Sequence, residues 1–113
     1  MLQKSKSAYT FWFAVVPNIP KTYRYTLGGK IDGYFLELLE CIFTALYLPP
    51  ERKISRIEQA MSKLDGVKFF TQIAWENKCI PNAQFVTLSE QLEEIGKMLG
   101  GWKKGLEKKT LPK

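Results

Sequence analysis

The hydrophobic positions of this chain recur at the spacing of an α-helix in four separate stretches. Apolar side chains three or four positions apart share one face of a helix, so each stretch predicts an amphipathic helix with a buried stripe. The predicted helices run from about 8 to 16, 20 to 46, 50 to 78 and 82 to 105. No stretch alternates polar and apolar residues over the length of a strand, which predicts an all-α protein.

The first stretch admits two interpretations. Residues 8 to 16 are rich in aromatic side chains and, taken alone, fit either a strand or a short helix. Tyr9, Trp12 and Phe13 follow helical spacing, and Ser7 is a suitable N-cap residue. We therefore expect a short helix here.

Short proline-containing segments at 17–20, 48–51 and 79–82 separate the four helices. Proline interrupts a helix interior but is tolerated in the first turn. Short connections make consecutive helices antiparallel. We expect one domain over residues 1–113, an antiparallel up-down-up-down four-helix bundle with flexible tails at 1–7 and 107–113.

Glycines interrupt several of the apolar stripes. Gly28, Gly29 and Gly33 lie early in the second helix, Gly66 in the third and Gly96 in the last. A glycine in a helix interior costs about 1 kcal/mol relative to alanine. We expect close approach by a neighbouring helix to offset this cost, with the glycines of the second and last helices as partners.

The chain carries a surplus of positive charge, with 17 Lys and Arg against 11 Asp and Glu and a formal net charge of +6. Such a surplus favours an anionic partner such as nucleic acid, although some soluble domains carry it for solubility alone. With 45% hydrophobic and 25% charged residues, the composition is that of a globular protein.

The candidate nucleic-acid contacts are basic residues near helix ends or beside aromatic side chains. They are Lys21, Arg24, Lys30, Arg52, Lys53, Arg56, Lys97, Lys103 and Lys104. The three at 52–56 stand against the dipole of a helix N-terminus, an unfavourable placement that suggests a function. Tyr23, Arg24 and Tyr25 fit either a stacking clamp on nucleic acid or a packed turn.

Several kinds of chemistry are excluded by composition and spacing. The chain has no histidine, and Cys41 and Cys79 lack the spacing of a zinc site. Glu37 and Glu40 lack the Glu-x-x-His partners of a di-iron bundle. We therefore expect no enzymatic activity, no cofactor and no metal.

The compartment follows from the same residues. No secretory signal is visible, and both cysteines lie in or beside apolar segments, as is typical of buried thiols in a reducing cytoplasm. The apolar run at 9–16 is far too short to span a bilayer, so we expect a cytoplasmic protein without membrane contact.

Two motifs resemble those of the accessory variability determinant (Avd) proteins. Residues 19–28 read Ile-Pro-Lys-Thr-Tyr-Arg-Tyr-Thr-Leu-Gly, similar to the start of that family's second helix. Residues 94–102 read Glu-Ile-Gly-Lys-Met-Leu-Gly-Gly-Trp, where the family has Glu-Ile-Gly-Arg-Met-Leu-Gly-Gly-Trp. Residues 64–74 are weakly similar to its third helix, and the resemblance extends from about 9 to 105.

The resemblance implies a role in a diversity-generating retroelement of bacteria or phages. Avd proteins form four-helix bundles that assemble into homopentameric barrels and bind the reverse transcriptase and template RNA. They support error-prone cDNA synthesis without being enzymes. Arg24 matches the family's basic position before aromatic-Thr-Leu-Gly, whereas Lys97 stands where arginine is usual and lacks its bidentate geometry.

Two other interpretations remain open. Related four-helix bundle proteins encoded in ribosomal RNA intervening sequences are also basic. A structural oligomer with incidental basic charge would show the same composition. A neighbouring reverse-transcriptase gene with its template and variable repeats would distinguish the first interpretation from these two.

Overall fold

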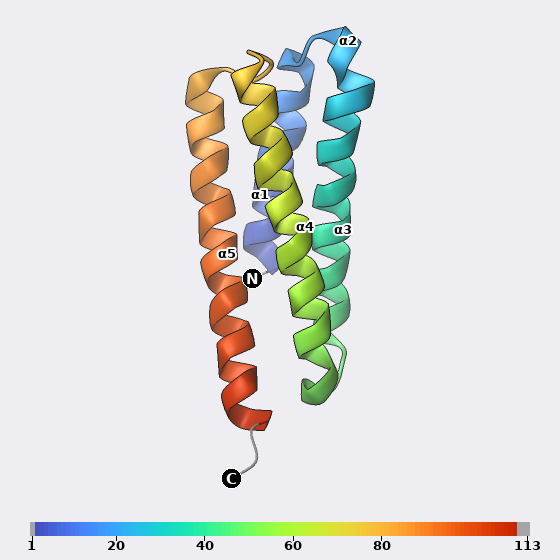
Figure 1. Ribbon diagram of the computed structural model, residues 1–113, viewed down its shortest axis with the longest axis vertical. Helices are drawn as coiled ribbons and strands as arrows, with labels where there is room; N and C mark the ends of the chain where they lie inside the picture. Colours follow the sequence, from blue (N-terminus) through green and yellow to red (C-terminus); the bar gives the residue numbers. More distant parts are fainter. Residues whose placement is uncertain (1, 111–113) are drawn as a thin grey trace.

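Four long helices run side by side in the computed structural model, which describes residues 2–110 (Figure 1). They are α1 (Leu2–Val15), α3 (Gly29–Leu46), α4 (Pro50–Glu76) and α5 (Asn82–Thr110). Following the colours of Figure 1 along the chain, each of these helices runs opposite to the one before it. The predicted all-α four-helix bundle is confirmed.

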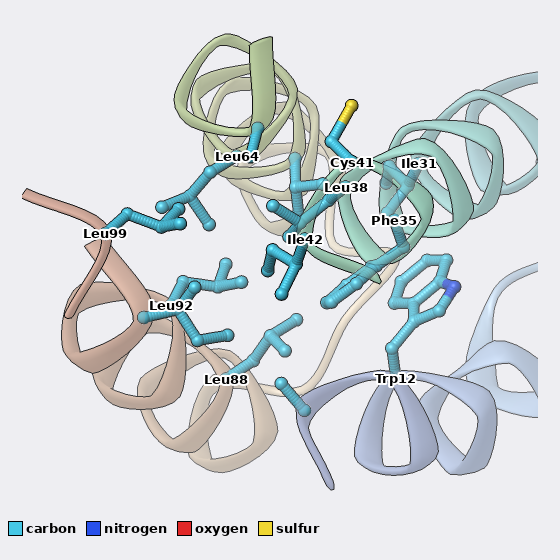
Figure 2. Packing of buried hydrophobic residues seen from close by; sticks show 14 of the residues in the cluster. Trp12, Ile31, Phe35, Leu38, Cys41, Ile42, Leu64, Leu88, Leu92 and Leu99 are labelled. Carbon is cyan, nitrogen blue, oxygen red and sulfur yellow. The ribbon is translucent and has the colours of Figure 1, made fainter. Parts of the chain in front are cut away.

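The helices form a ring around a common core. Both α1 and α4 pack on α3 and α5, so α3 and α5 lie diagonally across the bundle from each other. Figure 2 shows buried side chains from all four helices meeting along the axis, with Trp12 of α1 beside Phe35 of α3. Their rings stack with centroids 6.3 Å apart. On α5 the apolar stripe is buried as predicted, with Leu92 and Leu99 almost fully inaccessible.

The connection from α1 to α3 is itself helical. It consists of a 3₁₀ turn, η1 (Val16–Asn18), then α2 (Lys21–Tyr23) and a π-helical turn, η2 (Arg24–Gly28). The second predicted helix therefore starts where expected but contains one widened turn. Gly28 is buried there, and a Cβ on it would lie 3.5 Å from Ile19 Cδ1.

The N-terminal tail predicted at 1–7 is wrong for residues 2–7, which form the first turns of α1. Its polar sequence suggested fraying, but helical spacing brings Leu2 and Ser5 onto the packed face of the helix. Lys4 also forms an ion pair with Glu94 of α5. At the other end α5 continues to Thr110, and residues 111–113 of the predicted tail lie outside the described residues.

The predicted contact between the glycines of the second and last helices is also wrong. Because α3 and α5 are diagonal partners, a Cβ added at Gly29 or Gly33 would meet nothing within 4 Å. Gly96 faces α4 instead, with Leu64 Cδ2 3.4 Å from the position of an added Cβ. The one very close approach is at Gly66, where an added Cβ would lie 2.9 Å from ring atoms of Tyr34.

We predict that Gly66→Ala destabilises the protein by about 1 to 3 kcal/mol, because the new methyl group must displace the Tyr34 ring. Gly105→Ala is the matched control: this exposed helical glycine has no atom within 4 Å of an added Cβ. The free energy of unfolding of Gly105→Ala should rise by up to about 1 kcal/mol, because alanine favours a helix more than glycine does. Urea unfolding followed by circular dichroism measures both, and equal stabilities would contradict the close approach.

A polar contact ties α1 to α3. The Asp32 carboxylate accepts hydrogen bonds from the Tyr9 hydroxyl at 2.8 Å and from Trp12 Nε1 at 3.3 Å. Partial burial raises the pKa of Tyr9 to about 12, and the hydrogen bond and charge of Asp32 add to the shift. The folded protein therefore favours the neutral phenol.

The raised pKa predicts a loss of stability at high pH. An unfolded tyrosine releases its proton near pH 10, whereas folded Tyr9 holds its proton until about pH 12. The stabilisation is therefore complete below pH 10 and is lost as the pH rises to about 12. In urea titrations across this window, Tyr9→Phe should lose less stability than the wild type. Tyr25→Phe, which alters a largely exposed ring, should follow the wild type.

Candidate nucleic-acid interface

The predicted basic residues do not converge on one surface of the molecule. The bundle measures 54 × 22 × 20 Å, and its two ends carry separate groups. Lys21, Arg24 and Lys30 lie around the connection from α1 to α3. Lys97 lies between the ends on α5. At the opposite end, where α4 begins and α5 finishes, are Arg52, Lys53, Arg56, Lys103 and Lys104.

This last group and two further lysines form what we call the basic end. It comprises Arg52, Lys53, Arg56, Lys103, Lys104, Lys108 and Lys109. The antiparallel alignment of α4 and α5 brings these residues together, and an ion pair of 3.0 Å between Lys103 and Glu58 joins the two helices there. Lys108 and Lys109 belong to the flexible tail predicted at 107–113, but both lie in the last turn of α5.

Two members of the basic end are already engaged within the chain. The Lys53 ammonium donates hydrogen bonds to the carbonyls of Ala45 and Leu46, at 2.7 and 3.1 Å, and lies 5.9 Å from the Trp102 ring centroid. It thereby caps the C-terminus of α3. The hydrogen bond and charge of Glu58 raise the pKa of Lys103.

The other members keep their charge available to solvent. Arg56 donates a hydrogen bond to a neutral group, Gln59 Oε1 at 2.9 Å. Among residues 2–110, Arg52 and Lys104 form no ion pair and are exposed. Lys108 and Lys109 are exposed in the last turn of α5, where the helix dipole favours cations. The basic end therefore presents exposed cations from two helices at one end of the bundle.

Arg24 forms hydrogen bonds within its own segment. Its Nη2 donates to the carbonyls of Ile19 at 3.1 Å and Pro17 at 3.3 Å, which holds the turn between α1 and α2. The side chain is half-buried, and its guanidinium group donates hydrogen bonds to the backbone. Tyr23 and Tyr25 on either side are exposed, at 49% and 82%, and do not form a packed turn with it.

We predict that Arg24→Met lowers the free energy of unfolding by about 1 to 2 kcal/mol, because two carbonyls lose a charged donor. Lys21→Met removes an exposed cation from the same segment and should change stability by less than about 0.5 kcal/mol. Thermal or urea unfolding measures both variants. Equal stability of the two would show that Arg24 does not hold the turn.

Lys30 belongs to an aromatic cluster that sequence analysis did not identify. Its ammonium lies 5.2 Å from the ring centroid of Tyr34, and that of Lys63 lies 5.4 Å from the same ring. Tyr34 stacks on Phe70 of α4, with centroids 5.7 Å apart. Lys63 also pairs with Glu37 at 3.0 Å. The spacing of Lys30 and Tyr34, four residues apart on α3, was the signal available in the sequence.

Lys97 is exposed but stands in acidic surroundings on the outer face of α5. It shares a shallow depression with Glu90, Glu93 and Glu94. These carboxylates offset its attraction for phosphate. The electrostatics therefore favour the basic end over Lys97 as a nucleic-acid contact.

Other kinds of site are not formed by the described part of the chain. Within residues 2–110, no group of three or more His, Cys, Asp or Glu side chains is placed to hold a metal ion. Cys41 and Cys79 are buried free thiols. No described helix has the length and apolarity needed to cross a membrane.

The chain was compared with known proteins. A family model described as bAvd-like matches residues 1–106, nearly the whole sequence. A search of curated proteins returned no match.

Proposed function

This chain belongs to the bAvd-like family, and from that membership we propose a non-enzymatic accessory role in a diversity-generating retroelement. In this role it binds the reverse transcriptase and the template RNA or its cDNA in the cytoplasm, and supports mutagenic cDNA synthesis. The proposal extends the resemblance of residues 19–28 and 94–102 to Avd motifs.

The observation that carries the nucleic-acid part is the basic end of the bundle. Arg52 and Arg56 add positive charge to the N-terminal part of α4, where backbone N–H groups already attract anions. A cation in the first turn, such as Arg52, is unfavourable there by about 0.3 to 1 kcal/mol at an exposed site, and the effect is weaker at Arg56 in the second turn. A bound phosphate backbone would turn this repulsion into attraction. Cations that contact phosphates also release counterions, which supplies affinity without sequence specificity.

Assembly would multiply this surface. The resemblance implies a homopentamer, and in a closed ring every subunit is related to the next by rotation about one axis. Rotation keeps equivalent residues at the same height along that axis. With the long axis of each bundle along the ring axis, all copies of the basic end would lie on one rim, which suits a long polyanion contacted at several points.

We predict that Arg52→Ala with Lys104→Ala weakens binding to fluorescently labelled single-stranded RNA by at least about tenfold, as two lost charge-assisted contacts imply. The slope of log affinity against log salt should also fall by about 1 to 2. Fluorescence anisotropy over a salt series measures both quantities. Lys6→Ala with Lys78→Asn removes the same charge from exposed positions that are not among the candidate contacts, and should have a small effect. Asparagine is chosen at position 78 because it tolerates the positive φ there.

The control separates the alternatives. If both double variants weaken binding equally, net charge alone governs it and a structural oligomer with incidental charge is favoured. Affinity that does not change with salt would contradict phosphate contacts. A gene neighbourhood containing ribosomal RNA instead of a reverse transcriptase would favour the intervening-sequence type of bundle protein.

A further inference from the structure

The solvent-facing side of α3 carries a second regular pattern, distinct from its buried stripe. Its members, which we call the α3 seam, are Gly29, Gly33, Leu36, Glu40, Phe43 and Tyr47. All six are exposed, and successive members are alternately four and three residues apart. This is the heptad spacing by which one helix packs along another.

Within residues 2–110, no other helix covers the α3 seam. The exposed fraction is 48% for Leu36, 52% for Phe43 and 76% for Tyr47. The last two rings form a T-shaped pair with centroids 5.2 Å apart. An added Cβ at Gly29 or Gly33 would meet nothing within 4 Å. In the described part of the chain, no close contact therefore offsets the helix-propensity cost of these glycines, about 1 kcal/mol each.

We propose that the α3 seam pairs with the α3 seam of a second copy of this chain, antiparallel and about a two-fold axis. The residues of the seam have small side chains or none in its N-terminal half and bulky side chains in its C-terminal half. In the antiparallel register Tyr47 lies opposite Gly29, Phe43 opposite Gly33, and Leu36 opposite Glu40. Each aromatic ring then fills the space that a glycine leaves open, as ridges fill grooves between packed helices.

The parallel alternative fits less well. It would set glycine against glycine, which leaves gaps, and Glu40 against Glu40, which places like charges together. In the antiparallel pair the Glu40 carboxylate lies level with Leu36 of the second copy. Glu40, Glu37 and Lys63 line one surface depression of about 440 Å³. Cations of its own chain, Arg56 and Lys63, therefore lie near each Glu40. In the antiparallel register the two Glu40 positions are also offset by about 6 Å along the helix axis.

This contact goes beyond the proposed function and does not depend on it. A two-fold contact uses the same patch on both partners and is satisfied by one pair, whereas a ring requires two different patches on each subunit. The α3 seam would therefore join single chains, or complete rings, two at a time.

The first test is the molar mass in solution, measured by light scattering during size-exclusion chromatography. Phe43→Glu buries a charge in the seam and should halve the mass, from two chains to one, or from ten to five where a ring also forms. Phe69→Glu is the matched control, because Phe69 is 60% exposed on α4 outside the seam. It should leave the mass unchanged. An unchanged mass for Phe43→Glu, or equal changes for both, overturns the proposal.

The second test fixes the register and does not rely on disrupting the seam. Leu36→Cys and Glu40→Cys chains are mixed and oxidised, with unsubstituted protein as the blank for the native thiols. The mixture should give a disulfide-linked pair, because these positions lie opposite each other. Each variant alone should not, because its cysteines are offset by about 6 Å along the helix axis. Linkage of Glu40→Cys with itself, or no linkage in the mixture, overturns the antiparallel seam.

Discussion

The packing of α4 against α5 is the contact on which the surface of this protein depends. Leu64 of α4 and Leu92 and Leu99 of α5 are buried side by side in the core (Figure 2). Burying a leucine side chain contributes about 1.5 to 3 kcal/mol, so a slip of one helical turn would be costly. The resulting register sets Glu58 against Lys103 and, nearer the middle, Lys68 against Glu93. Once the register is set, the first turns of α4 must meet the last turns of α5, which creates the basic end.

The same helices present two surfaces of different physical character. At the basic end, exposed cations such as Arg52 and Lys104 create a field that acts over a Debye length and weakens with salt. Along α3, the exposed rings of Phe43 and Tyr47 and the open space at Gly33 offer a contact that depends on shape and dehydration. Added salt should therefore weaken anion binding at the basic end, because it screens charge, and leave contacts of the α3 seam largely intact.

Periodicity and turn residues were sufficient to predict the four helices. Proline fixed the breaks between them, and Pro50 begins α4 as expected. The predicted end of α4 at residue 78 is two residues too late, because Lys78 adopts a left-handed conformation with φ of 62°. No residue pattern predicted that conformation. The first turns of α1 were missed because residues 2–7 are mostly polar. Their order depends on Ser5 and Lys4 meeting other helices, which is information that a local pattern does not contain.

The candidate site was predicted less well, for a physical reason. A sequence shows where the basic residues are, but not which of them donate hydrogen bonds to backbone carbonyl groups in the folded chain. Arg24 and Lys53 both donate to carbonyl groups that become accessible only once a turn and a helix end have formed. For the glycines, helical spacing predicted the face on which Gly33 lies but not its neighbour. The tightest approach in residues 2–110 is at Gly66, 2.9 Å from the Tyr34 ring.

The two bonds from Lys53 to Ala45 and Leu46 have a thermodynamic consequence. They connect a member of the basic end to the carbonyls that immediately precede Tyr47, the last residue of the α3 seam. A bound phosphate that drew the Lys53 ammonium away would weaken the final turn of α3. Phosphate binding at the basic end would therefore change the free energy of assembly at the α3 seam. Such coupling is reciprocal, and assembly would alter anion affinity by the same factor. Through Lys53, anion binding at the basic end and assembly at the α3 seam would then affect each other.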